Sequence, residues 1–139
     1  MIIYFDSRTG NVQRFAQKVA AERPFWNVVN IRDGYVGPGH LITYTAGAGQ
    51  VPEKTRNFLE DNNENIHTVS ASGNRNWGQR FGAAARRINA DYNIPINHVF
   101  ELSGFEADLK TFISKVQTHS LHQKPVSGED QSCRFQRGI

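Results

Sequence analysis

Short apolar runs alternate with amphipathic segments along most of this chain. In the amphipathic segments the apolar residues recur every three to four positions, which is the spacing of a helix with one buried face. Strands that alternate with such helices are typical of a parallel sheet covered by helices on both faces. The expected strands are residues 2–5, 26–31, 40–44, 66–71 and 95–102, and the expected helices are residues 11–22, a segment after Pro52, residues 77–92 and a segment after residue 105.

The apolar faces of the expected helices identify the candidate core. Ser103 and Glu106 have the spacing of a capping box, so the last helix is expected to begin there. Each expected helix has one apolar face that can cover the sheet. The residues expected to face inward are Val12, Phe15, Ala16 and Val19, then Phe58 and Leu59, then Phe81, Ala84, Ala85 and Ile88, and finally Leu109, Phe112, Ile113 and Val116.

The length and the composition favour one domain in the cytoplasm. A chain of 139 residues with 38% hydrophobic residues can bury one core. No segment approaches the roughly 18 apolar residues of a membrane span. The short apolar run at the N-terminus follows no basic region, so secretion is disfavoured. The expected domain is residues 1–118, and residues 119–139 are polar and aperiodic enough to be a loose C-terminal tail.

The charged and sulfur-containing residues exclude several classes of protein. The net charge is +3, but Lys and Arg alternate with Asp and Glu and form no basic stripe, so nucleic acid is not an expected partner. The only cysteine, Cys133, lies in the polar tail, which excludes a disulfide scaffold and a zinc knuckle. No metal site is expected, because the histidines have structural roles by default and only the last two have a metal-like spacing: His40, His67, His98, His119 and His122.

The turn after the first strand is the strongest chemical signal in the chain. Residues 6–11 are rich in hydroxyls, contain Gly10 and lead directly into a helix. Free backbone N–H groups and the positive end of a helix dipole make such a turn suited to a phosphate. The fingerprints for dinucleotides and for ATP are both absent, and residues 47–49 lack the third glycine of the former. A mononucleotide is therefore the expected ligand.

Two more loops are expected beside this turn, because ligands of open parallel sheets lie beyond the carboxyl ends of the strands. Residues 45–50 are glycine-rich and uncharged, so a flat ring could approach their backbone closely. Residues 72–78 place Trp77 in a polar loop, where it could stack on an aromatic ring. The alternative for Trp77 is a core position at the start of the third helix. With the phosphate turn, these loops indicate flavin mononucleotide (FMN).

Four separated motifs, which occur in the right order, resemble the NrdI family of small flavodoxin-like proteins associated with class Ib ribonucleotide reductase. The motifs are residues 6–15, 43–52, 71–78 and 100–104, and the resemblance covers residues 1 to about 118. It implies a flavodoxin-like, three-layer α/β/α fold with a five-stranded parallel sheet in the order 2-1-3-4-5. It also implies that FMN is the cofactor and that the chemistry takes place on the flavin, with no catalytic side chain.

The resemblance further implies a task and a set of binding residues. In this family the reduced flavin reacts with O2, and an oxidant thought to be superoxide reaches the dimanganese centre of the reductase small subunit, where it helps to generate the tyrosyl radical. A separate reductase would supply the electrons. The implied cofactor-binding residues are Ser7, Arg8, Thr9, Gly10, Asn11, Val12, Thr43, Tyr44, Thr45, Ala46, Gly47, Ser72, Gly73, Asn74, Trp77 and Gly78. Val12 departs from flavodoxins, which usually have Thr there, so one hydrogen bond to phosphate is missing.

The charges of the loops predict an unusual flavin. Neither residues 45–50 nor residues 72–78 contain Asp or Glu, and Arg75 adds a positive charge. An anionic reduced flavin is destabilised by nearby negative charge. The fully reduced flavin is therefore expected to be more accessible here than in an acidic flavodoxin.

Two alternative functions stay open at the level of sequence. A general flavodoxin electron carrier would also bind FMN, but it would not need the reductase subunit. A phosphate-binding domain or phosphohydrolase without redox chemistry could use Asp6 as a general base. The three loops offer no second carboxylate that could complete a metal site for such an enzyme.

Overall fold

The computed structural model describes residues 1–122 of the chain. Within this part, five strands form one parallel sheet in the order β2-β1-β3-β4-β5. The expected fold class and strand order are therefore confirmed. The strands are β1 (Ile2–Phe5), β2 (Asn27–Asn30), β3 (Gly39–Tyr44), β4 (Ile66–Gly73) and β5 (Ile96–Glu101).

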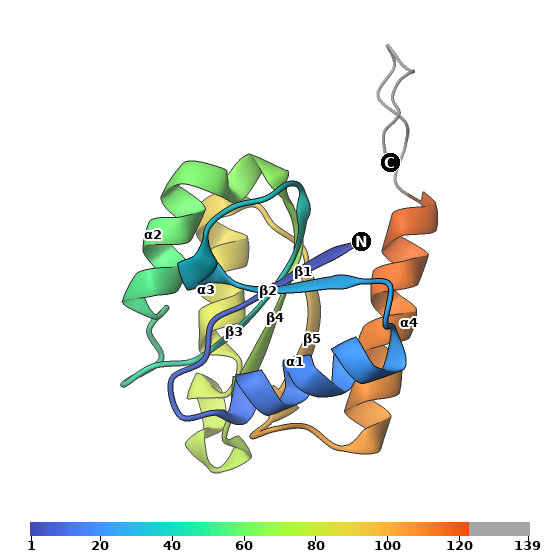
Figure 1. The fold of residues 1–139 in the computed structure, drawn as a ribbon. Helices are drawn as coiled ribbons and strands as arrows, with labels where there is room; N and C mark the ends of the chain where they lie inside the picture. The colour runs from blue at the N-terminus through green and yellow to red at the C-terminus, as the bar shows by residue number, and fades with distance from the viewer. Residues whose placement is uncertain (123–139) are drawn as a thin grey trace.

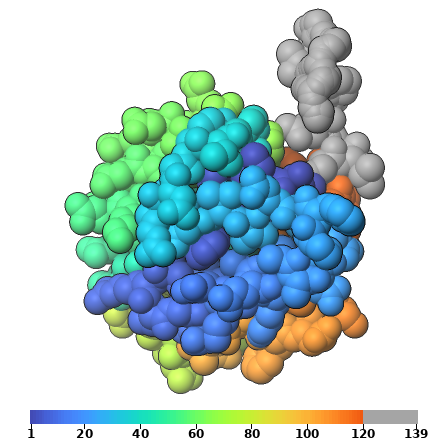
Figure 2. Space-filling model, viewed as in Figure 1, coloured from blue at the N-terminus to red at the C-terminus, as the bar shows by residue number. Residues whose placement is uncertain are grey.

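Helices cover both faces of the sheet, so the protein has three layers (Figure 1). The helices α1 (Asn11–Glu22) and α4 (Glu106–His122) lie on one face, and α2 (Glu53–Asn62) and α3 (Ala83–Tyr92) lie on the other. In the space-filling view, residues of α1, of β2 and of the segment after β2 form the front face (Figure 2). Within residues 1–122, no helix combines the length and the apolar character that a membrane span requires.

The sheet separates two apolar clusters. Neighbouring residues of a strand point to opposite faces. Tyr4 and Leu41 accordingly belong to the cluster under α2 and α3, whereas Ile3 and Ile42 belong to the cluster under α1 and α4. Every helix residue expected to face inward is buried except Phe81. The predicted core is thus confirmed at all but one position.

The third helix begins later than the sequence predicts, at Ala83 instead of residue 77. Residues 75–80 form a 3-10 segment, η3 (Arg75–Arg80), that is interrupted at Gly78 with φ 61° and ψ −121°. Gly82, just before α3, has φ 75°, and a Cβ there would lie 2.9 Å from Cγ1 of Val99. Both glycines leave the right-handed helical conformation, so an apolar period that runs across them does not make one helix. Phe81 lies between them and is only half-buried.

The last helix begins where it was expected, but its cap is a different residue. The Asp108 carboxylate accepts the backbone N–H of Phe105 (2.8 Å), and its other oxygen lies 2.9 Å from Nε2 of His98. Burial opposes ionisation of this carboxyl, but the two hydrogen bonds outweigh burial and hold the pKa of Asp108 below its usual value. The predicted pairing of Ser103 with Glu106 is wrong, because Glu106 is the first residue of α4 and the capping carboxylate comes from the third.

The helix α4 also ends later than predicted. It continues to His122, so residues 119–122 of the predicted tail are helical. The rest of the predicted tail, residues 123–139 with Cys133, lies outside the described residues.

Three histidines form a cluster that the sequence did not predict. The ring centroids of His40 and His67 are 5.4 Å apart, and that of His119 lies 5.6 Å from His40 and 6.0 Å from His67. They meet because β3 and β4 are neighbours and the C-terminal part of α4 packs near them. Nδ1 of His40 lies 2.7 Å from Oγ1 of Thr68. Within residues 1–122, no group of three or more His, Cys, Asp or Glu residues is arranged to hold a metal ion.

The histidine cluster predicts acid sensitivity of the fold. Burial first, and then the neighbouring His67, His119 and the N-terminal amine, lower the pKa of His40 from 6.5 to about 3. Below pH 6.5, His40 therefore binds a proton in the unfolded chain, whereas in the folded protein it stays unprotonated until the pH is much lower. The free energy of unfolding should fall between pH 6.5 and pH 5 by up to about 1.4 kcal/mol per pH unit for this histidine. Urea unfolding at several pH values measures this slope.

The variant His40→Gln provides the control, because glutamine does not titrate. Its free energy of unfolding should decline less steeply than that of the unmodified protein over the same pH range. An equally steep decline in both proteins would contradict the assignment of the acid sensitivity to His40.

Candidate functional site

Three loops meet at the carboxyl edge of the sheet, as the sequence predicts. We call residues 6–12 the phosphate loop, residues 45–50 the glycine loop and residues 72–78 the tryptophan loop. The backbone N–H of Asp6 donates to the carbonyl of Ile42 (3.0 Å), and that of Thr45 donates to the carbonyl of Ser72 (3.1 Å). Loops that follow β1, β3 and β4 therefore start side by side, at the lower end of the view in Figure 1.

The phosphate loop leads into a helix end that is not neutralised by the protein. The residue that precedes α1, Gly10, has no side chain to cap the helix, and the first turn contains no acidic residue. Oγ of Ser7 accepts the backbone N–H of Gln13 (3.1 Å), which leaves the hydroxyl hydrogen of Ser7 able to donate to a ligand. The positive helix end and the absence of an acidic residue favour an anion at this place.

Arg14 adds a full positive charge to the phosphate loop, which the sequence did not reveal. Its Nη2 donates to Oδ1 of Asn11 (2.7 Å), and its Nη1 lies 3.0 Å from the point that a Cβ on Gly10 would occupy. The signal in the sequence was its position one helical turn after Gly10. Val12, in contrast, is buried in the cluster under α1 and α4, so its side chain packs in the core and its backbone alone faces the loop.

The glycine loop is a small closed ring. Ala46 and Gln50 exchange both backbone hydrogen bonds, at 2.8 and 2.7 Å. Gly47 has φ 48° and Gly49 has φ 99°, which side chains rarely allow. Gly47 and Ala48 are exposed, whereas a Cβ on Gly49 would lie 3.3 Å from the Cβ of Ala83. The exposed side of the glycine loop therefore presents its backbone, and no bulky side chain, to a flat ligand.

The tryptophan loop holds its aromatic side chain outside the core. Oδ1 of Asn74 accepts the N–H of Asn76 (2.9 Å), and the Asn74 carbonyl accepts the N–H of Trp77 (3.0 Å). The Trp77 side chain is 37% exposed and belongs to neither apolar cluster. The alternative in which Trp77 is a core residue is therefore wrong, and its ring is available to a ligand.

Three predicted site residues use their hydroxyls inside the protein. The hydroxyl of Ser72 donates to the carbonyl of Leu102, and that of Thr43 lies 2.7 Å from the hydroxyl of Thr55. Oγ1 of Thr45 accepts the N–H of Ala84 (3.3 Å). These three residues can face a ligand with their backbone, while their side chains position the loops.

The charge of Arg75 does not stand alone, which corrects the electrostatic argument from sequence. Its Nε lies 3.7 Å from Oε1 of Glu101, and its guanidinium lies 5.0 Å from the ring centroid of Phe81. Glu101 ends β5, so counting charges within the loops alone missed it. The guanidinium of Arg86 donates to the carbonyls of Gln79 and Phe81 and thereby holds the end of η3 against α3.

The phenol of Tyr44 is influenced by two charges of the phosphate loop. Burial, and then the negative charge of Asp6, raise the pKa of its phenol, while the positive charge of Arg8 acts in the opposite direction. The aromatic side chain at the end of β3 is thus within electrostatic reach of the phosphate loop.

The predicted site residues lie at one edge of the sheet with different exposure. All sixteen belong to the three loops or to the end of β3, and the residues that reach solvent alternate with those that are buried. Exposed are Arg8, Thr9, Gly47, Trp77 and Gly78; half-buried are Ser7, Gly10, Asn11, Tyr44, Ala46 and Asn74; buried are Val12, Thr43, Thr45, Ser72 and Gly73.

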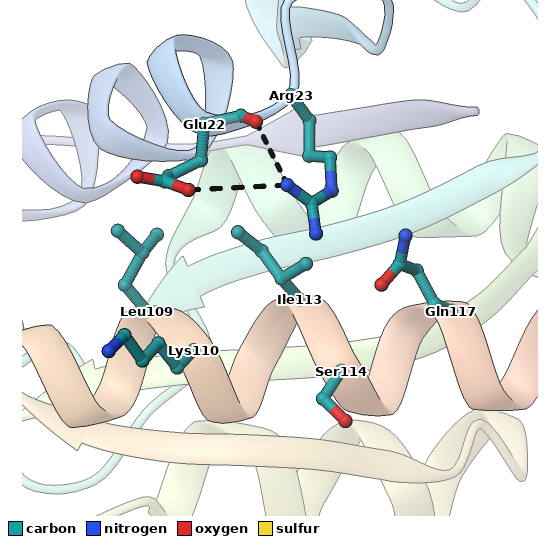
Figure 3. Close-up of a pocket in the computed structure, with 7 residues that line it drawn as sticks. All are labelled: Glu22, Arg23, Leu109, Lys110, Ile113, Ser114 and Gln117. Carbon is teal, nitrogen blue, oxygen red and sulfur yellow. Dashed lines mark hydrogen bonds and ion pairs between the residues drawn. The ribbon is translucent and has the colours of Figure 1, made fainter.

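A pocket of about 130 Å³ lies elsewhere, between the end of α1 and α4 (Figure 3). At its rim, Nη1 of Arg23 lies 4.0 Å from a carboxylate oxygen of Glu22 and donates to the Glu22 carbonyl (3.0 Å). None of its lining residues belongs to the three loops: they are Glu22, Arg23, Leu109, Lys110, Ile113, Ser114 and Gln117. This pocket is therefore not part of the candidate site.

Known proteins resemble this chain over nearly all of the part that contains the site. A family model described as "NrdI Flavodoxin like" matches residues 3–114. "Protein NrdI" of Bacillus licheniformis is 45% identical over 117 residues, which are 83% of this chain and 86% of that protein. "Protein NrdI" of Macrococcus caseolyticus is 39% identical over 119 residues, which are 84% of this chain and 89% of that protein. The chain belongs to the NrdI flavodoxin-like family.

Proposed function

We propose that this protein binds FMN and supplies an oxidant, superoxide, for assembly of the dimanganese-tyrosyl radical cofactor in the small subunit of class Ib ribonucleotide reductase. The proposal includes a cytoplasmic location and a separate reductase as electron donor. The observation that carries it is the positive start of α1, whose first turn contains no acidic residue, beside an exposed glycine loop and an exposed Trp77. Membership of the NrdI family supports the link to ribonucleotide reductase.

The residues present fit the phosphate of FMN. The first turn of α1 contains no acidic residue and Gly10 before it has no capping side chain, so this helix end is suited to a dianion. Arg14 would add a charge-assisted hydrogen bond, and Ser7 and Thr9 would add hydroxyl donors. Flavodoxins usually have Thr at the position of Val12, and the hydrogen bond to the phosphate that Val12 cannot donate would be replaced by that of Arg14.

The residues also fit the flavin ring. The exposed backbone of Gly47 and Ala48 would lie against one part of the ring, and the indole of Trp77 would stack on it. When bound and reduced, FMN supplies the electron that converts O2 to superoxide. The protein's own contribution is to bind, orient and expose the cofactor, because the only carboxylate in the three loops, Asp6, is buried.

The geometry disfavours a phosphohydrolase. Asp6 is 4% exposed and accepts a hydrogen bond from Thr55 (2.7 Å), so it does not face the phosphate loop's solvent side as a general base would. A general flavodoxin electron carrier remains the second candidate, because the same loops would bind FMN for that purpose.

The first test separates the candidate functions. The purified protein should be yellow, and the reduced protein mixed with O2 and the manganese-loaded small subunit should give the electron paramagnetic resonance signal of a tyrosyl radical. The matched control omits the protein but adds the same reduced FMN. A colourless protein that binds no added FMN would reject every flavoprotein function, and a yellow protein without radical formation would leave the electron carrier.

The second test concerns the phosphate contact of Arg14. The variant Arg14→Ala should weaken FMN binding about tenfold, which is about 1.4 kcal/mol, because a charge-assisted contact to the phosphate is lost. Titration of the apoprotein by quenching of flavin fluorescence measures the affinity. Riboflavin, which lacks the phosphate, should bind both proteins equally, and Arg87→Ala, on the exposed side of α3, should leave FMN binding unchanged. Equal losses for both flavins would contradict a phosphate contact.

The third test concerns stacking on Trp77. The variant Trp77→Ala should weaken the binding of FMN and riboflavin to the same extent, about five- to tenfold, because stacking acts on the ring that both share. Trp77→Phe keeps an aromatic face and should recover most of the affinity. A loss confined to FMN would place Trp77 near the phosphate instead of the ring.

A further inference from the structure

Asp6 is a buried carboxylate at the centre of the candidate site whose purpose the function above does not explain. It follows β1 directly and is 4% exposed. The hydroxyl of Thr55 donates to its Oδ2 (2.7 Å), and Oγ1 of Thr43 lies 2.7 Å from Oγ1 of Thr55. Both threonines are fully buried. Burial of a carboxylate is costly unless hydrogen bonds or nearby positive charge offset it, so this position requires a reason.

The hydrogens of the two threonines fix the direction of this chain of hydrogen bonds. Each hydroxyl has one hydrogen to donate. Thr55 gives its hydrogen to Asp6, so the hydrogen between the two threonines must come from Thr43. This chain of hydrogen bonds therefore runs from Thr43 through Thr55 and ends at the Asp6 carboxylate, which can only accept hydrogen bonds while it is ionised.

These hydrogen bonds join the phosphate loop to the end of β3 and to the start of α2. Asp6 begins the phosphate loop, Thr43 lies two residues before the glycine loop, and Thr55 lies in the first turn of α2. Because Thr55 binds Asp6 from this first turn, the positive end of α2 lies near the buried carboxylate, although the same turn also contains Glu53. One carboxylate thus sets the position of the phosphate loop relative to the point where the glycine loop leaves the sheet.

We propose that Asp6 is a positioning residue of the flavin site: through Thr55 and Thr43 it holds the glycine loop in place, and its buried negative charge makes the anionic, fully reduced flavin harder to form. This inference rests on the proposed binding of FMN. Asp6 would thereby regulate the same site, because the ease of the second reduction step decides how readily the bound flavin gives electrons to O2.

The charge of Asp6 reaches the residues around the site. It contributes to the raised pKa of Tyr44, after burial, and Tyr44 ends the strand that leads into the glycine loop. A charge inside the protein is screened much less than an exposed one. Glu101, by comparison, is paired with Arg75, so its negative charge is offset by a neighbour.

The experiment measures the two one-electron reduction potentials of the FMN-loaded protein by redox titration. When the first electron arrives with a proton, the flavin gains no net charge, whereas the second electron makes it anionic. The variant Asp6→Asn should therefore raise the second potential relative to the first by about 59 mV, which is a tenfold change in the equilibrium of that step. Asp61→Asn removes an exposed carboxylate at the far end of α2 and should change neither potential.

A pair of variants at Thr55 tests the positioning role separately from the charge. Thr55→Val removes the hydroxyl while the side-chain volume and Asp6 remain, and it should weaken FMN binding about tenfold in a fluorescence titration. Thr55→Ser restores a hydroxyl and should restore the affinity. These variants keep the inference testable if Asp6→Asn does not fold, which circular dichroism would report.

The outcomes distinguish the two proposals. If the unmodified protein binds no FMN, the proposed function fails and this inference fails with it. If the unmodified protein binds FMN but Asp6→Asn shifts both potentials equally or not at all, or Thr55→Val binds FMN as Thr55→Ser does, the inference about Asp6 is overturned and the proposed function stands.

Discussion

The parallel pairing of β1 with β3 and of β3 with β4 is the constraint on which the rest of the structure depends. Ile3 pairs with His40 and Leu41 pairs with Val69, so the strands advance in register toward one edge. Their residues are buried on both faces, and a slip by one position would move apolar side chains from one core cluster to the other. Because the strands cannot slip, three loops that are distant along the sequence must meet where the strands end.

The same constraint gathers positive helix ends at that edge. In a parallel sheet each helix that follows a strand starts near the strand's carboxyl end, so the N-termini of α1 and α2 lie on the side of the loops. The residues that precede the two helices, Gly10 and Pro52, provide no side-chain cap. The N-terminus of α1 is left for an anion from outside, whereas that of α2 lies near the protein's own carboxylate at Asp6. One edge of the sheet therefore combines an anion-binding loop with a buried anion.

The sequence predicted the sheet, the faces of the helices and the three loops, because these follow from local periodicity and from the rule that parallel strands end at one edge. The predictions from sequence failed at the start of the third helix and at contacts between residues that are distant in the sequence. The period of the third helix ran through Gly78 and Gly82, whose backbone conformations end a helix. Thr55 and Glu101 gained their roles from contacts that no spacing reveals. The histidine cluster likewise depends on neighbouring strands and on the path of α4.

Asp6 in the phosphate loop and Arg14 in the first turn of α1 carry charges that act over different ranges. The guanidinium of Arg14 is exposed, so salt and water screen its field and it acts mainly on a group in contact with it, such as a phosphate. The carboxylate of Asp6 is buried, and its field passes through protein, where screening is weak. The loop and the helix that follows it can therefore attract the anionic end of a ligand through contact and still oppose added negative charge on the rest of it. Under the proposed function, this separation would let tight binding of the phosphate coexist with a flavin that readily gives up its electrons.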